Sequence, residues 1–202
     1  MSRTGKIFML SLVLLLAAAN ARAAVKTGEP APDFNLTDIN GQSQSLSQFK
    51  GKYVVLEWIN NDCPFVKKHY GSGNMQSLQI AYGEKGVIWL SINSSAPGKE
   101  GSVSAEKARE LTQRNGAAPT AFFLDLDGKV GKLYGAQATP HMFIINPEGL
   151  LIYQGAIDDT PSVDAADIPA AKNYVKAALD EAMAGQPVTT AATKAYGCSV
   201  KY

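Results

Sequence analysis

The sequence predicts an α/β fold in which helices cover both faces of a mixed central sheet. Residues 53–59 and 86–92 are nearly all apolar and rich in β-branched and aromatic residues, a composition typical of central strands buried on both faces. A segment of helical composition follows each run. Further on, residues 142–145 and 150–153 flank a clear hairpin turn. Strands that alternate with helices and are followed by an antiparallel hairpin indicate a mixed sheet.

The first predicted element is a β-hairpin, because Asn40-Gly41 separates two short strand-like segments. After the first central strand comes Pro64, a favoured first residue of a helix. Residues 65–82 are helical in composition, and two glycines within them predict a kink. The turn between this strand and this helix therefore lies at the carboxyl edge of the sheet, where sites gather in such folds.

The second half of the chain continues the pattern. Ser104 is a suitable N-cap for the next helix, and residues 120–124 form a third strand. A last helix is predicted to begin near Pro169, with apolar residues every three to four positions, and to end at Gly185. Residues 186–202 show no periodicity and are predicted to form a C-terminal tail.

The N-terminus differs in kind from the rest. Arg3 and Lys6 precede an apolar run over residues 7–19, and an A-x-A cleavage site lies at 21–23. The run is shorter than the roughly 20 residues of a membrane span, so we expect a cleaved signal peptide and no stable membrane insertion afterwards. We expect export across the inner membrane, to the periplasm. The predicted organisation is a signal peptide over 1–23, one domain over 24–185 and a tail over 186–202.

Composition excludes several classes of function. The chain has 19 basic and 18 acidic residues and a net charge of +1, which argues against a nucleic-acid partner. Two cysteines are too few for a disulfide-dense scaffold or an all-cysteine zinc site. A copper or zinc site made by Cys63, His141 and Cys198 stays an alternative, but nothing in the spacing demands it. We expect no metal ion and no cofactor.

Cys63 is the first candidate for chemistry, because it lies between a buried strand and the start of a helix. Backbone N–H groups and the helix dipole at that position stabilise a thiolate and lower the pKa of the thiol. Lys67, one helical turn on, adds to this effect. The alternative is an inert buried cysteine that packs as a small hydrophobic residue. Position alone does not separate the two interpretations.

The neighbouring residues carry a resemblance that favours a reactive thiol. Residues 55–64 resemble the strand and active-site turn of the thioredoxin superfamily, and residues 138–145 resemble its cis-proline loop and following strand. Residues 28–34 are similar to the entry segment of redoxins and alkyl-hydroperoxide-reductase-type peroxiredoxins. The resemblance covers about residues 28–202. It implies a thioredoxin fold with an N-terminal β-hairpin extension.

A closer resemblance, to a peroxiredoxin-like branch, rests on four short motifs. They are Asp62-Cys63-Pro64-Phe65-Val66, Thr139-Pro140-His141, Gly155-Ala156-Ile157-Asp158-Asp159 and Tyr196-Gly197-Cys198-Ser199.

The sequence departs from both family patterns. Thioredoxins have Cys-x-x-Cys, but Val66 takes the place of the second cysteine. Peroxiredoxins have Pro-x-x-x-Thr/Ser-x-x-Cys, but here Leu56 stands at the proline position and Asn60 at the Thr/Ser position. No arginine follows Arg114 to polarise a peroxide. The usual dithiol cycle is therefore impossible within this motif, and a conventional peroxiredoxin site is incomplete.

The resemblance implies roles for further residues. Glu57 lies where thioredoxins place a buried acid that moves protons for the thiols, and burial on a central strand would raise the pKa of its carboxyl. The alternative is a glutamate that faces water. Thr139 and Pro140, joined by a cis bond, are expected to hold the extended chain of a partner, and Pro64 is expected to contact substrate.

The two histidines and the Asp158-Asp159 pair have less specific expected roles. We predict that His69, beside two lysines, lies on a solvated helix face. Asp158 and Asp159 are predicted to form a solvated strand end. His141 either lines the site or is a half-exposed strand residue.

Cys198 is the second thiol of the chain. Roughly 3.3 Å per extended residue lets the tail reach back across the sheet, so Cys198 could resolve Cys63 by forming a disulfide in one redox state. The alternative is a free or intermolecular thiol on a frayed terminus.

The expected function is thiol-disulfide exchange through Cys63, with a disulfide-containing protein or a small thiol as partner. Two alternatives stay open. One is a thiol-dependent, antioxidant peroxide reductase in which Cys63 becomes a sulfenic acid. The other is a redoxin module that holds a thiol partner or a metal without turnover.

Overall fold

The computed structural model describes residues 25–202, so the predicted signal peptide lies outside the described residues. No helix within this range combines the length and the apolar character that crossing a bilayer requires.

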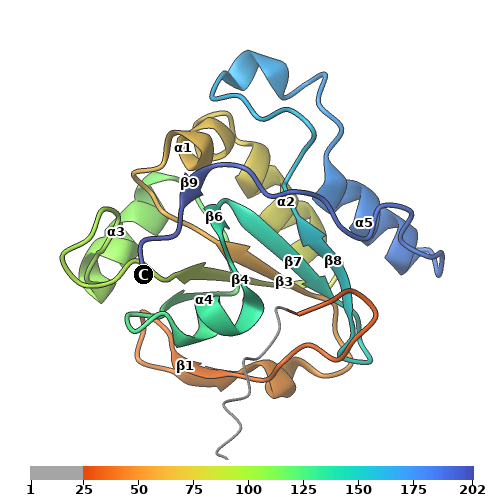
Figure 1. Cartoon of the computed structure of the whole chain (residues 1–202), viewed down its shortest axis with the longest axis horizontal. Coiled ribbons are helices and arrows are strands. Elements are labelled where there is room, and N and C mark those ends of the chain that lie inside the picture. The colour runs from red at the N-terminus through yellow and green to blue at the C-terminus, as the bar shows by residue number, and fades with distance from the viewer. Residues whose placement is uncertain (1–24) are drawn as a thin grey trace, which may run out of the picture.

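A five-stranded mixed sheet forms the centre of the protein, in the order β5-β4-β3-β7-β8 (Figure 1). The middle strand β3 (Val54–Trp58) runs parallel to β4 (Ile88–Asn93), which in turn runs parallel to β5 (Ala121–Leu124). On its other side β3 pairs antiparallel with β7 (His141–Ile145), and β7 pairs antiparallel with β8 (Leu151–Gly155). The prediction of a mixed sheet that ends in an antiparallel hairpin is confirmed.

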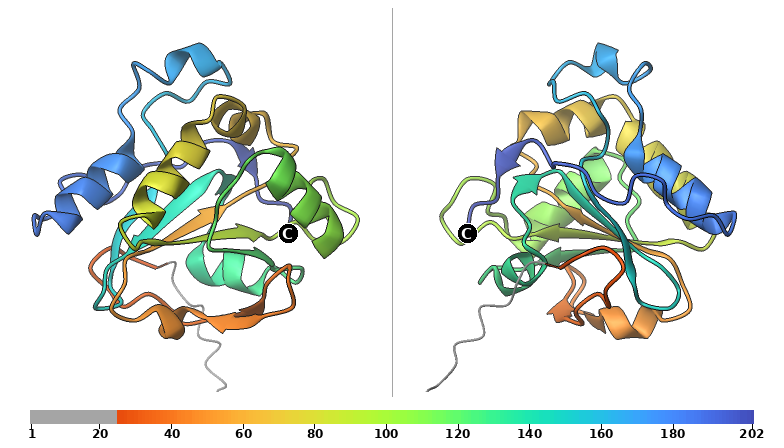
Figure 2. Two further views of the ribbon diagram at one scale, coloured as in Figure 1. Left: turned by 180° about the vertical axis from the view of Figure 1, so that it is seen from behind. Right: turned by 45° about the vertical axis from the view of Figure 1, so that its right-hand side comes forward.

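Other elements cover both faces of this sheet (Figures 1 and 2), and a cluster of buried hydrophobic side chains lies on each face. One face is covered by α1 (Pro64–Gly71), α2 (Asn74–Gly83), α3 (Ala105–Arg114) and α5 (Tyr174–Met183). The opposite face is covered by α4 (Lys129–Tyr134), the hairpin of β1 (Asn35–Thr37) and β2 (Ser43–Ser45), and the short helix η1 (Leu46–Phe49). Alternate residues of β3 enter the two clusters, which explains why this strand is apolar almost throughout.

Capping and turn residues explain where the helices begin. The Ser104 side chain accepts a hydrogen bond from the Lys107 N–H at 3.1 Å, so the predicted N-cap of α3 is confirmed. The predicted kinked helix is two helices, because Gly73 adopts a φ of +77° between α1 and α2. The last helix begins at Tyr174 and not near Pro169, since Asn173 caps it.

One helix was missing from the sequence prediction. The six residues of α4 begin after Gly128, and the buried Asp125 carboxylate accepts hydrogen bonds from the N–H groups of Val130 and Gly131. A helix this short shows too few turns for a periodic pattern.

The C-terminal tail is ordered. It crosses the edge of β8, where Gln154 exchanges backbone hydrogen bonds with Ala191 and Thr193 at 3.1 and 3.0 Å. It then forms β9 (Cys198–Ser199), which pairs antiparallel with β6 (Ala138–Thr139) at the end of the sheet (Figure 1). The tail is therefore not frayed, and the Cys63–Cys198 disulfide stays a prediction, because both cysteines are free thiols here.

Candidate active site

Cys63 lies in a tight turn between β3 and α1. The Asn60 side chain accepts a hydrogen bond from the Asp62 N–H at 2.8 Å, and the Asn60 carbonyl accepts one from the Cys63 N–H at 3.1 Å. This Asx-type turn places Cys63 at the N-cap of α1. The Cys63 side chain is 0% exposed.

The structure brings Cys63, Thr139, Pro140 and Cys198 together. The Cys63 thiol donates a hydrogen bond to the Thr139 carbonyl at 3.1 Å. The Thr139–Pro140 bond is cis, as the resemblance implies. Thr139 pairs with Cys198 in the register of β6 and β9, and each of the two thiols shifts the pKa of the other. Both cysteines are free thiols.

The pKa values of the two thiols are shifted in opposite directions. Burial raises the pKa of Cys63, but hydrogen bonds from the Cys198 and Thr139 side chains and from the backbone of Val66 and Cys198 outweigh burial and lower it. Burial, followed by the hydrogen bond and negative charge of Cys63, raises the pKa of Cys198 to about 12. Cys63 is therefore the more easily ionised thiol. Hydrogen bonds from Cys198 in the tail contribute to the lowered pKa of Cys63. The sequence predicted only the contribution of the helix N-terminus and Lys67.

Glu57 is fully buried on β3, so the water-facing alternative is wrong. Its carboxylate accepts four side-chain hydrogen bonds, from Tyr70 at 2.9 Å, Gln79 at 3.3 Å, Trp89 at 2.8 Å and Ser91 at 3.1 Å. Burial raises the pKa of Glu57, and the four hydrogen bonds offset only part of that effect. The acid therefore holds a proton more readily than an exposed glutamate does.

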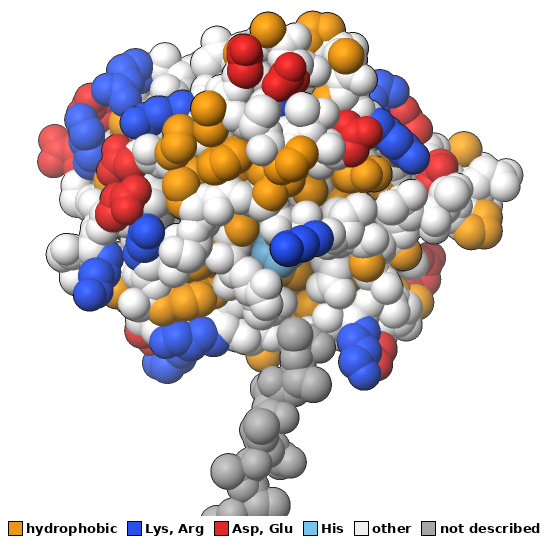
Figure 3. Space-filling view, turned by 45° about the horizontal axis from the view of Figure 1, so that its top comes forward, with side chains coloured by type: hydrophobic (Ala, Val, Ile, Leu, Met, Phe, Trp, Pro, Cys, Tyr) orange, Lys and Arg blue, Asp and Glu red, His pale blue; other side chains and the backbone are white. Residues whose placement is uncertain are grey.

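The surface next to the cysteines combines apolar and charged groups. Pro64 is exposed at the first turn of α1, and Phe65 beside it is half-buried. A shallow groove runs from Pro64 and Lys67 to Val163, which is 53% exposed. Figure 3 shows hydrophobic side chains gathered on one face of the molecule, with charged side chains around them.

His69 and Asp158, both predicted to be solvated, are 0% and 2% exposed. The neighbouring Lys68 is buried as well, at 3%. The loop after β8 folds over α1, and the Lys68 ammonium donates to the Thr160 carbonyl at 3.0 Å. Asp158 lies 4.0 Å from the Lys68 ammonium and 3.8 Å from His69. A long-range contact between a loop and a helix leaves no periodic signal, so the sequence did not reveal it.

His141 is also buried, with its ring 4.4 Å from that of Phe143, and burial lowers its pKa to about 4. Among residues 25–202, no three His, Cys, Asp or Glu side chains converge so as to hold a metal ion.

The sequence similarity agrees with this geometry. A model of the AhpC/TSA family matches residues 27–154, more than half of the chain. The chain belongs to the AhpC/TSA family. It is 31% identical over 144 residues to the thiol-disulfide oxidoreductase ResA of Geobacillus thermodenitrificans, an alignment that covers 60% of this chain and 82% of that protein. The family model ends before the tail that carries Cys198.

Solved structures show the fold of this AhpC/TSA-family chain. A hypothetical protein of Sinorhizobium meliloti has a TM-score of 0.74 and 26% identity, covering 89% of this chain and 96% of its own. The thioredoxin domain of a Bacteroides vulgatus thiol-disulfide oxidoreductase has a TM-score of 0.52 and 23% identity, covering 65% and 89%. The protein has the thioredoxin fold.

Proposed function

We propose that this AhpC/TSA-family protein is an enzyme that exchanges disulfides through Cys63 and Cys198. The chain is related to thiol-disulfide oxidoreductases of the thioredoxin type. The observation that carries the proposal is the placement of both cysteines at the cis-proline loop, where Thr139 accepts a hydrogen bond from the Cys63 thiol and pairs with Cys198, with Cys63 the more easily ionised thiol. A thiolate paired with a neighbouring protonated thiol is the arrangement that disulfide exchange needs.

The proposed reaction consists of two exchanges, after which a small thiol must reduce the Cys63–Cys198 disulfide before the protein can react again. The Cys63 thiolate attacks a disulfide of the partner, which forms a mixed disulfide and releases one partner thiolate. The Cys198 thiol then attacks Cys63, forms the Cys63–Cys198 disulfide and releases the second partner thiol. Glu57, with its raised pKa, takes up and returns protons in the interior during these exchanges.

The proposed partner is a disulfide-containing protein or a small thiol. The Thr139 carbonyl, which precedes Pro140, contacts the Cys63 thiol, and Pro64 is exposed beside it, so all three are expected to contact that partner. Because Cys63 is buried, the partner reaches it only when a covering segment moves. The tail, which pairs with Thr139, is the segment that we expect to move.

Replacing Cys198 with serine tests this function, because the first exchange should continue while the second stops. With glutathione disulfide, Cys198→Ser should accumulate a stable Cys63–glutathione adduct, and the wild type should form a Cys63–Cys198 cross-link instead. Peptide mass mapping without reductant distinguishes the two products. If oxidised wild-type protein also keeps the adduct and forms no cross-link, Cys198 does not resolve Cys63.

Membership of the AhpC/TSA family keeps a thiol-dependent, antioxidant peroxide reductase as the second candidate. Leu56 and Asn60 at the peroxiredoxin motif positions count against it. Parallel assays of insulin reduction and of peroxide consumption decide between the two. Peroxide consumption that is faster than disulfide reduction would favour the peroxidase.

We also propose that the protein is exported to the periplasm with residues 1–23 removed, leaving a domain over 24–185 and a tail over 186–202. The apolar run and the A-x-A site support this proposal. The mass of the purified mature protein should correspond to a chain that begins at Ala24. A chain that retains Met1 would contradict both export and the argument for an oxidising compartment.

A further inference from the structure

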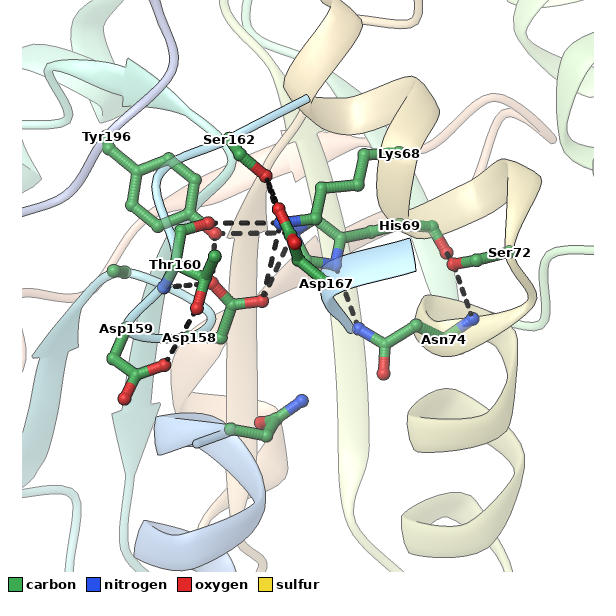
Figure 4. Close-up of polar contacts among 12 residues, drawn as sticks. Lys68, His69, Ser72, Asn74, Asp158, Asp159, Thr160, Ser162, Asp167 and Tyr196 are labelled. Atoms are coloured by element: carbon green, nitrogen blue, oxygen red, sulfur yellow. Dashed lines mark hydrogen bonds and ion pairs between the residues drawn. The ribbon is translucent and has the colours of Figure 1, made fainter. Parts of the chain in front are cut away.

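A partly buried cluster of polar side chains, which we call the Tyr196 anchor, ties the tail to α1 (Figure 4). It consists of Tyr196, Asp158, His69 and Asn74. Tyr196 lies on the tail two residues before Cys198, His69 lies on α1 and Asp158 follows β8. The mechanism proposed above uses none of these side chains.

Hydrogen bonds run through the anchor in one direction. The Asn74 Nδ2 group donates to His69 Nδ1 at 2.9 Å, which leaves the ring proton on Nε2. That Nε2 lies 3.4 Å from the Tyr196 hydroxyl, which in turn donates to the Asp158 carboxylate. Desolvation by burial lowers the pKa of His69 to about 4, so the ring is neutral at neutral pH, as this arrangement requires. The Tyr196 hydroxyl therefore both accepts and donates, and removing it breaks the chain in the middle.

A ring contact and a close backbone approach hold the same stretch of tail. The Tyr196 ring meets the Phe65 ring edge-on, with centroids 5.7 Å apart, next to the first residue of α1. Gly197 adopts a φ of +132° and approaches so closely that a Cβ there would lie 2.1 Å from the Thr139 carbonyl oxygen. Tyr196 and Gly197 therefore fix the position of the backbone immediately before Cys198.

We propose that Tyr196 is a positioning residue that holds Cys198 against Cys63 and closes Cys63 to solvent. This inference rests on the proposed function. When the anchor opens, an external disulfide reaches Cys63. When it closes, the Cys198 thiol attacks Cys63 in its glutathione adduct, the Cys63–Cys198 bond forms, and the Cys198 proton leaves with glutathione as its thiol.

Tyr196→Phe removes the hydroxyl and keeps the ring on Phe65. The anchor should then open more often, so reduced Cys63 should react with iodoacetamide about tenfold faster or more, the factor expected for one hydrogen bond to a charged group. Resolution of the Cys63–glutathione adduct should slow by a similar factor, because Cys198 is in place less often. Peptide-resolved mass spectrometry follows both rates.

The matched control is Tyr82→Phe, which removes a tyrosine hydroxyl bonded to Asp180 at 2.8 Å, between α2 and α5 and outside the Tyr196 anchor. It should leave both rates unchanged, which separates positioning from a general loss of stability. If Cys198→Ser accumulates the adduct but Tyr196→Phe changes neither rate, or changes only one of them, the positioning role is wrong and the proposed function stands. If Cys198 resolves nothing, the proposed function itself fails.

Discussion

Replacing Cys63 with serine is expected to abolish disulfide exchange, with a loss of at least about a hundredfold in rate. The hydroxyl of serine does not ionise at neutral pH and cannot attack sulfur as a thiolate does. Cys198 would be the thiol that remains, and desolvation by burial is the largest cause of its raised pKa of about 12. Stoichiometric reaction of the reduced protein with a chromogenic disulfide measures the loss.

Cys198→Ser is the matched control for this experiment, because it also removes one thiol from the same contact. It should keep a rapid single reaction at Cys63, because the backbone and the serine hydroxyl at position 198 can still donate hydrogen bonds to the Cys63 thiolate. If Cys63→Ser reacted as fast as Cys198→Ser, the nucleophile would be Cys198 and the roles of the two thiols would be exchanged.

Local signals in the sequence predicted most of the fold. The apolar runs gave β3 and β4, the cap at Ser104 gave the start of α3, and Asn40-Gly41 gave the β1–β2 hairpin. Each of these features depends on residues that lie close together in the chain, where propensity and periodicity act. The position of Cys63 at the start of a helix also followed from its own neighbours.

The surroundings of the site depend on contacts between distant segments, and the sequence predicted them only in part. The tail lacks periodicity because its backbone pairs with β6 and β8, while its side chains meet different elements in turn. The sequence predicts a solvated helix face at His69, because the loop that covers this part of α1 comes some ninety residues later in the chain. The motif around Cys198 is visible in the sequence, but the contacts of Tyr196 are visible only in the structure.

Replacing Glu57 with alanine is expected to lower the free energy of unfolding by about 3–5 kcal/mol. The change leaves a cavity beside β3 and removes the acceptor shared by four buried donors. Equilibrium denaturation by urea measures the loss. Asp180→Ala is the control, since Asp180 also accepts from a tyrosine but lies near the surface, and its loss should be much smaller.

Glu57→Gln keeps the volume and separates stability from proton transfer. Burial raises the pKa of Glu57 in the folded state above the ordinary glutamate value of 4.5, so folding favours the protonated carboxyl. The stability that this group contributes is therefore present in full below about pH 4.5 and is lost as the pH rises through the folded pKa. Relative to Glu57→Gln, whose side chain does not titrate, the wild type should lose stability over that range. A constant difference in unfolding free energy across the range would show that the pKa is the same in the folded and unfolded states.

At neutral pH Glu57→Gln should slow disulfide exchange more than it changes stability. An unchanged exchange rate would remove Glu57 from the proton path.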